Sequence, residues 1–321
     1  MRAWHLGGFI LFCSLLALAQ QDSPATTPPS TSPAEPAGSA PAVQKSASLP
    51  DLKPDADGAL SQEQMRELTR IVLQNHRDNN RKQRDYTYID REVVHKLDGK
   101  GRVQSTETKT YEIMELYGDQ VRRLMEKDDK PLDAKEAAKE EERIQKLADR
   151  RKNETEDEKR KRQEEKEKAR QKWLEIFSEV PDAYNFRLVG SEVLNGRDTW
   201  VIDGEPRPDF HARSRDSEAL SRLHGRLWVD KAEMQLTKMD IEIIDTVSFG
   251  WVLVRFHKGT RFVYEQARVN DEVWLPQHYE AKVDARIALF KGDNEQDAGT
   301  YRDYKKFRTS SKIVGMGEVK K

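Results

Sequence analysis

Cysteine is nearly absent from this 321-residue sequence, which contains only Cys13. Because Cys13 lies in an N-terminal segment that we expect to be removed, the mature chain should have no disulfide, no thiolate metal site and no cysteine nucleophile. An excess of charge of one sign is also absent, since 56 basic residues face 57 acidic ones. The net charge of -1 provides no field that would favour nucleic acid or an anionic membrane, and we predict no nucleic-acid partner.

Sequence motifs of catalytic and cofactor sites are absent as well. There is no glycine loop that would hold a phosphate, no histidine pair with the helical spacing of a zinc site and no serine elbow. The histidines are scattered singly. His257 and His278 could meet across neighbouring strands and bind a metal, but single strand histidines are more often surface residues. We therefore predict a protein that is not an enzyme and has neither a cofactor nor a metal site.

An apolar run long enough to span a bilayer is missing too. The N-terminal run Leu6–Leu16 is shorter than the about 20 residues of a transmembrane helix. Arg2 precedes it, and Ala17-Leu18-Ala19 follows it with the small-x-small pattern that signal peptidase cuts. We predict that residues 1–19 are a cleaved signal peptide, which implies export to the periplasm and no transmembrane span in the mature chain. The alternative is an uncleaved anchor helix.

Large apolar residues are scarce in residues 20–59, which are rich in proline, serine, alanine and threonine. Such a segment cannot bury enough surface to offset the entropy cost of ordering, so we predict a disordered spacer. Ordered structure should begin at Ser61, which can form a capping box with Gln64 at the start of a helix. We place the folded domain at residues 60–308 and a C-terminal tail at 309–321.

Charged residues dominate the segment 133–172, where 15 basic and 13 acidic residues are interspersed among 40 positions. Capping residues Asp133 and Thr155 predict two helices with a break near Asn153. Acid–base pairs four residues apart could stabilise a helix that packs on nothing. We predict a charged helical insertion at residues 130–178 that projects from the domain. A solvated helix pair and an arm that binds a protein partner both fit this charge pattern.

Apolar and polar residues alternate with a period of two through most of the remaining chain, as in half-buried strands. The predicted strands are 86–97, 103–116, 184–194, 197–203, 227–229, 236–244, 247–257, 260–269, 273–289 and 301–307, with a short helix near 217–223. Asn195-Gly196 is a strong hairpin signal, and 247–257 should pair with 260–269 across Lys258-Gly259. Short connections and the absence of alternating strands and helices predict an antiparallel meander rather than a parallel nucleotide-binding sheet.

Aromatic residues are concentrated in these strands. Strand parity puts Phe249 on the same face as Trp251 and Phe262 on the same face as Tyr264, while Trp228 lies on an earlier strand. A strongly curved sheet with helices across one opening can enclose an apolar ligand, so these five residues are candidates for the lining of a cavity. The alternative is an ordinary hydrophobic core, since every sheet must bury one face.

Four segments give the chain a family resemblance, namely GSEVLNGRDTW at 190–200, GRLWVD at 225–230, EVWLP at 272–276 and YKKF at 304–307. Together they resemble the lipoprotein-carrier superfamily of the Gram-negative periplasm, the LolA-like and RseB-like domains, over about residues 61–116 and 180–308. The resemblance implies an unclosed antiparallel barrel wrapped around helices, with an apolar concave face that receives acyl chains. It implies no catalytic residues.

We therefore predict an α+β fold, in which a curved, partly closed antiparallel sheet (an unclosed barrel) carries an N-terminal helix and the charged helical insertion. The resemblance favours a periplasmic, non-enzymatic binding protein for a lipid, a lipoprotein or another apolar partner. The alternative is a structural or scaffolding protein of the cell envelope that uses its charged helical arm for protein contacts.

Overall fold

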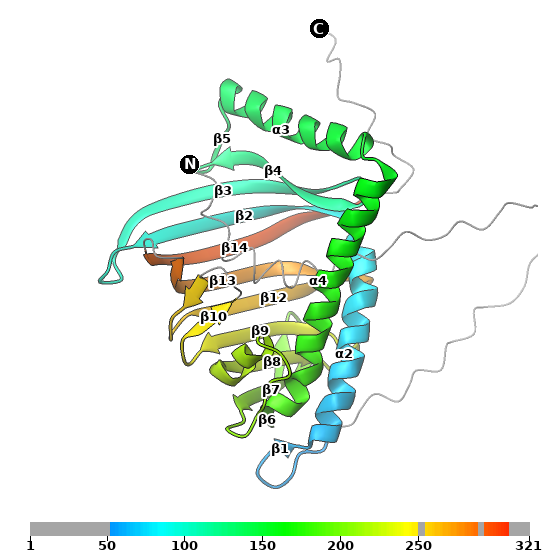
Figure 1. The fold of residues 1–321 in the computed structure, drawn as a ribbon, viewed down its shortest axis with the longest axis vertical. Coiled ribbons are helices and arrows are strands. Elements are labelled where there is room, and N and C mark those ends of the chain that lie inside the picture. Colours follow the sequence, from blue (N-terminus) through cyan, green and yellow to red (C-terminus); the bar gives the residue numbers. More distant parts are fainter. Residues whose placement is uncertain (1–51, 250–253, 288–291, 308–321) are drawn as a thin grey trace, which may run out of the picture.

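The β-rich part of the sequence forms one antiparallel sheet of 14 strands within the residues that the computed structural model describes, 52–249, 254–287 and 292–307. Three α-helices accompany the sheet in this part of the chain, and two of them lie side by side across its strands (Figure 1). The sheet begins at one edge strand and ends at another, so it is not closed into a barrel. The predicted α+β class and the unclosed antiparallel sheet are confirmed.

The strands are β1 (Ala59–Leu60), β2 (Tyr86–Leu97), β3 (Val103–Leu116), β4 (Asp119–Lys127), β5 (Lys130–Pro131), β6 (Tyr184–Leu194), β7 (Arg197–Pro206), β8 (Leu223–Asp230), β9 (Leu236–Ile243), β10 (Val247–Phe249), β11 (Val254–Phe256), β12 (Arg261–Val269), β13 (Val273–Ile287) and β14 (Gly292–Lys306). Their order across the sheet is β1-β6-β7-β8-β9-β12-β13-β14-β2-β3-β4-β5, with the β10–β11 hairpin attached to β13. The sheet is antiparallel, as predicted, and three runs of consecutive strands form meanders, but the whole order is not one continuous meander. The last strand, β14, pairs with β2, so the N-terminal strands extend the sheet beyond it.

Local turn chemistry explains the hairpin between β6 and β7. Asn195 and Gly196 both have positive φ, at 51° and 76°, the combination that a two-residue type I′ turn requires. Asn tolerates this region and Gly adopts it without a steric penalty. The hairpin predicted from this dipeptide is confirmed, with Leu194 opposite Arg197.

The predicted pairing of 247–257 with 260–269 is wrong. The first segment divides into β10 and β11, which pair with each other, and β11 then pairs with β13. The chain does not reverse at Lys258-Gly259. Strands β11 and β12 run in the same direction along β13, and the other edge of β12 pairs with β9. Gly259 has a φ of 87°, and its N–H donates to the carbonyl of Ile243. The glycine thus marks a local kink between two strands that run in the same direction.

The helices begin where capping residues predicted. Helix α2 (Gln62–Gln83) has the predicted capping box of Ser61 and Gln64, and helix α4 (Glu156–Ala183) has a second one. Helix α3 (Ala134–Lys152) ends at Asn153, the predicted break, and a 3-10 helix, η1, spans Ser217–Arg222. Among the described residues, no helix combines the length and the apolar character needed to cross a membrane.

Helix α2 is held on the sheet by both apolar and polar contacts. Met65 and Leu68 are buried in the largest core cluster. One turn before the C-terminal end of α2, the buried side chain of Asn79 pairs with the backbone of Trp274 on β13. Its Nδ2 donates to the carbonyl, and its Oδ1 accepts from the amide, both at 2.7 Å. This paired contact satisfies polar groups that would be costly to bury alone and fixes how the helix lies across the strands.

The folded part begins earlier than predicted. Leu52, which falls within the predicted spacer, is only 6% exposed and belongs to the same core cluster as Met65. Residues 59 and 60 form β1, which pairs with β6. The predicted start at Ser61 is wrong. The few apolar residues between positions 52 and 60 are flanked by polar ones, so they give no periodic signal of ordered structure. The predicted signal peptide, residues 20–51 of the predicted spacer and the tail at 309–321 lie outside the described residues.

The charged insertion does not project freely from the domain, in contrast to the prediction. Ile144 of α3 is 8% exposed and packs with Leu116 and Val121 of the sheet. The amide of Leu124 on β4 donates to Glu140 Oε1 at 2.8 Å. The helix is therefore docked against the outermost long strand. Its thin apolar stripe was visible in the sequence, but the strand that it covers, β4, was not predicted.

Asp119, at the start of β4, ties both insertion helices to the sheet. Its carboxylate lies 3.1 Å from Arg151 Nη2 of α3 and 3.3 Å from Arg162 Nη1 of α4, and it also pairs with Lys166 of α4. All four side chains are at most 20% exposed, so solvent screens these ion pairs less than ordinary surface pairs. One carboxylate thus neutralises part of a concentrated basic cluster.

We expect Asp119→Ala to lower the free energy of unfolding by about 2–3 kcal/mol, the scale of hydrogen bonds to charged groups, because three cations lose their shared partner. The matched control is Asp157→Ala, which removes a carboxylate paired with Arg160 at 73% and 64% exposure and should cost less than about 0.5 kcal/mol. Urea unfolding measures both. Equal, small effects in the two variants would mean that the insertion is not anchored through Asp119.

Candidate functional site

Helices α2 and α4 enclose an apolar cavity of about 210 Å³ against the sheet. We call the sheet face that they cover the inner face. The described lining residues are Met65, Leu68, Thr69, Val72, Leu73, Trp173, Ile176, Phe177, Val180, Tyr184, Phe186, Ile202, Gly204, Asp216, Ala219, Leu220, Leu223, Gly225, Leu227, Val229, Leu236, Met239 and Ile241. Most of these side chains are apolar, so the interior offers few partners to a polar ligand.

The periodicities of the two element types produce this lining. On β8 every second residue faces the cavity, from Leu223 through Gly225 and Leu227 to Val229. On α4 the lining residues Trp173, Ile176, Phe177 and Val180 follow the helical spacing of three and four. Trp173 also stacks on Phe177, with 3.9 Å between ring centroids. The apolar end of the charged insertion is therefore one wall of the cavity.

Two glycines leave room at the floor of the cavity. Gly204 on β7 lies directly opposite Gly225 on β8, and both line the cavity. The ring of Phe186 covers Gly204, since a Cβ atom there would lie 3.0 Å from Phe186 Cε1. At Gly225 a Cβ would meet only the terminal methyl group of Ile241, at 3.1 Å. A larger residue at position 225 would thus extend into the cavity.

Asp216 is the only charged side chain among the described lining residues. Its Oδ2 lies 2.6 Å from Lys172 Nζ of α4. A polar hollow adjoins the cavity at this point and has Asp216 in common with it. The other residues that line the hollow are Glu167, Lys168, Gln171, Lys172, Glu175 and Ser214. The apolar interior therefore meets a charged rim between α4 and the segment that leads into η1.

The structure places three of the five predicted site residues, Trp228, Phe262 and Tyr264, on one or the other face of the sheet. Trp228 alternates with the lining residues of β8, so it lies on the outer face, where its Nε1 donates to Glu192 Oε2 at 2.7 Å. Phe262 and Tyr264 lie on the inner face, opposite the lining residues Ile241 and Met239, but are not among the residues that line the cavity.

Phe262 instead packs beside the cavity, in a neighbouring core cluster with Ile243 and Phe256. Phe249 is the last residue of β10, and Trp251 lies outside the described residues. A ligand role for the inner-face aromatics stays a prediction.

The lining that the sequence interpretation missed comes from α2, from the end of α4 and from the small residues of β7 and β8. The signal that could have predicted this lining is the apolar face of each helix, with Met65 and Leu68 on α2 and Ile176 and Phe177 on α4.

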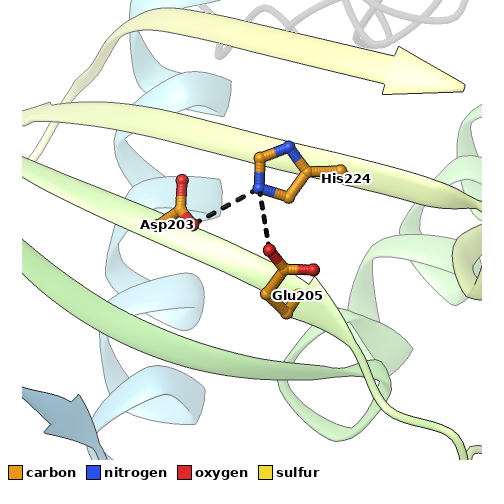
Figure 2. Close-up of side chains that lie close together, drawn as sticks. All are labelled: Asp203, Glu205 and His224. Atoms are coloured by element: carbon orange, nitrogen blue, oxygen red, sulfur yellow. Dashed lines mark hydrogen bonds and ion pairs between the residues drawn. The ribbon is translucent and has the colours of Figure 1, made fainter. Parts of the chain in front are cut away.

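A second cluster lies on the outer face, behind the cavity floor. Figure 2 shows His224 of β8 pointing toward Asp203 and Glu205 of β7, with His224 Nε2 3.3 Å from Asp203 Oδ2 and 3.5 Å from Glu205 Oε1. The predicted alternative pair does not form. His278 is opposite Glu265 and Thr300, whereas the backbone of His257 bonds to Asp284, six residues further along β13.

A third cluster, largely buried, joins residues of β2, β4 and β13. Arg122 Nη2 lies 2.9 Å from Asp90 Oδ2 and 3.0 Å from Glu92 Oε2, and the hydroxyl of Tyr279 donates to Glu92 Oε1 at 3.2 Å. Asp90 Oδ1 is buried without a hydrogen-bond partner in the described part of the chain. Burial raises the pKa of Asp90 from 3.8 to about 6, against the opposing effect of Arg122.

Comparison with known proteins gives structural neighbours only. No protein-family model and no curated protein matches the chain. Among solved structures, a domain of a proposed outer membrane lipoprotein-sorting protein from Vibrio parahaemolyticus is 12% identical, with a TM-score of 0.30, over 76% of this chain and 93% of that one. A LolA superfamily protein from Nitrosomonas europaea is 11% identical, with a TM-score of 0.27, over 72% and 89%.

MucB, solved in complex with the periplasmic part of MucA, is 11% identical, with a TM-score of 0.20, over 74% of this chain and 93% of that one. These neighbours include the group that the sequence motifs resemble.

Proposed function

We propose that this chain is a non-enzymatic binding protein that holds the acyl chain of a lipid or lipoprotein in the cavity between α2, α4 and the sheet. The observation that supports this proposal is the composition of the lining, in which mainly apolar side chains surround a cavity of about 210 Å³. We propose that the protein acts in the periplasm after removal of residues 1–19, as the sequence motif at 17–19 favours.

The size of the cavity favours a segment of a chain over a whole lipid. An apolar cavity of about 150 Å³ accommodates benzene, whereas sites for drug-sized ligands occupy about 300–1,000 Å³. A volume of about 210 Å³ therefore suits part of an acyl chain. The rest of the molecule would leave the cavity near Asp216 and Lys172, where the polar hollow can accommodate a hydrophilic end.

A chain-length series of fatty acids tests the proposal. Each buried methylene contributes about 0.8 kcal/mol, so affinity should rise about fourfold per carbon until the cavity is filled and should then level off. The measurement is displacement of a fluorescent fatty acid from protein purified from the periplasmic fraction, where we expect an N-terminus at or near Gln20.

Native mass spectrometry of the same preparation should detect co-purified lipid. Affinity that rises without levelling off would indicate adsorption to a surface rather than a defined cavity. If neither lipid nor probe binds, the scaffold hypothesis is favoured, because α4 presents an exposed charged face over much of its first half that a protein partner could contact.

A further inference from the structure

Three oxygen and nitrogen donors converge on one point of the outer face. His224 Nε2, Asp203 Oδ2 and Glu205 Oε1 all lie within 4.8 Å of one another, and the two His–carboxylate separations are 3.3 and 3.5 Å. Ligands bound tetrahedrally at zinc–ligand distances of 2.0–2.2 Å are separated by roughly 3.3–3.6 Å. Two of the three donor separations therefore match the edge of a zinc coordination tetrahedron.

The sheet register holds these donors in place. Asp203 pairs with Arg226 and Gly204 with Gly225, so Glu205 comes level with His224 on the neighbouring strand. Asp203 and Glu205 are two residues apart and therefore project from the same face. Because two hydrogen-bonded strands carry all three ligands, binding an ion requires only side-chain adjustment.

Arg226 orients one of these ligands. Its Nε donates to Asp203 Oδ1 at 2.8 Å, which leaves Oδ2 directed at His224. Outer-shell hydrogen bonds of this kind fix the orientation of metal-binding carboxylates. The two carboxylates and one guanidinium sum to a charge of −1, which a divalent cation would offset.

We propose that Asp203, Glu205 and His224 bind a divalent transition-metal ion, with zinc the best match. An imidazole with two carboxylates suits zinc, whereas calcium and magnesium prefer oxygen ligands alone. Glu205 is 64% exposed, so the fourth position is open to water or to a ligand from a partner. The ion would cross-link β7 and β8 directly behind the glycine floor of the cavity and would stabilise the folded state by mass action.

Zinc titration of the untagged, chelator-treated mature protein tests this site. Calorimetry should detect one zinc per chain, and zinc should raise the midpoint of thermal unfolding. Both His224→Ala and Glu205→Gln should weaken zinc binding at least tenfold. Since Glu205 is exposed, its variant should fold normally even if the histidine variant does not.

The matched control is His278→Ala. His278 Nε2 lies 3.0 Å from Glu280 Oε1 on β13, but this pair belongs to no three-ligand group among the described residues. Zinc affinity and the thermal shift should be unchanged in this variant. Absence of zinc binding to the wild-type protein, unchanged affinity in Glu205→Gln, or an equal loss in His278→Ala would overturn the proposal.

Discussion

Gly225→Leu is expected to lower the affinity for a fluorescent fatty acid at least tenfold while leaving the protein as stable as the wild type or more so. The added side chain enters the cavity, and its Cβ meets only the movable end of Ile241. Leucine also favours a strand interior, where glycine costs roughly 0.5–1 kcal/mol in backbone entropy. Filling an empty cavity removes ligand space without removing any native contact.

A graded series of alanine, valine and leucine at position 225 should show progressive loss of probe affinity, measured together with urea unfolding. Gly99→Leu is the control, because Gly99 lies in an exposed hairpin turn where an added Cβ would have no other atom within 4 Å. This variant should bind the probe normally. Normal binding by Gly225→Leu would mean that the probe sits elsewhere. Overpacking typically costs about 1–3 kcal/mol, and a larger loss of stability would mean that the cavity beside Gly225 is already filled.

Asp90→Asn is expected to remove a large part of the pH dependence of stability between pH 4 and pH 6. In the wild type, the pKa of Asp90 is raised by burial to about 6 from 3.8. Between these values the unfolded chain has lost the proton that the folded chain retains, so stability falls as pH rises. At about 1.4 kcal/mol per unit of pKa, the effect amounts to about 3 kcal/mol.

The asparagine variant cannot ionise, so its stability relative to the wild type should increase from pH 4 to pH 7 in urea unfolding experiments. Asp129→Asn serves as the control. Asp129 is an exposed carboxylate paired with Arg91, and its pKa is lowered by that hydrogen bond rather than raised. Removing it should not reproduce the effect. If the pH profiles of Asp90→Asn and the wild type are parallel, Asp90 ionises in the folded protein as it does in the unfolded chain.

Much of the secondary structure was predictable, because the signals are local. The capping box at Ser61, the helix break at Asn153 and the Asn195-Gly196 turn each depend on residues within four positions of one another. β4 was missed because its sequence, DQVRRLMEK, has few of the β-branched and aromatic residues that indicate a strand.

The cavity was predicted only in kind. Aromatic residues suggested a lined cavity, yet Trp228 lies on the outer face and Phe262 in the adjacent core cluster. The floor depends instead on Gly204 facing Gly225, and a glycine pair gives no hydrophobic signal. Only the register between β7 and β8 brings these two residues together.

The sequence by itself determined all the helices, most of the strands other than β1, β4 and β5, and that one sheet face is apolar. Local hydrogen bonding and side-chain periodicity are enough for these features. Only the tertiary structure decided that β14 pairs with β2, that Asp119 anchors the charged insertion and that His224 meets Asp203 and Glu205. Each of these contacts joins residues roughly 20 to 200 positions apart. Many pairings of strands and opposite charges are chemically equivalent in the sequence, and packing of the whole sheet selects among them.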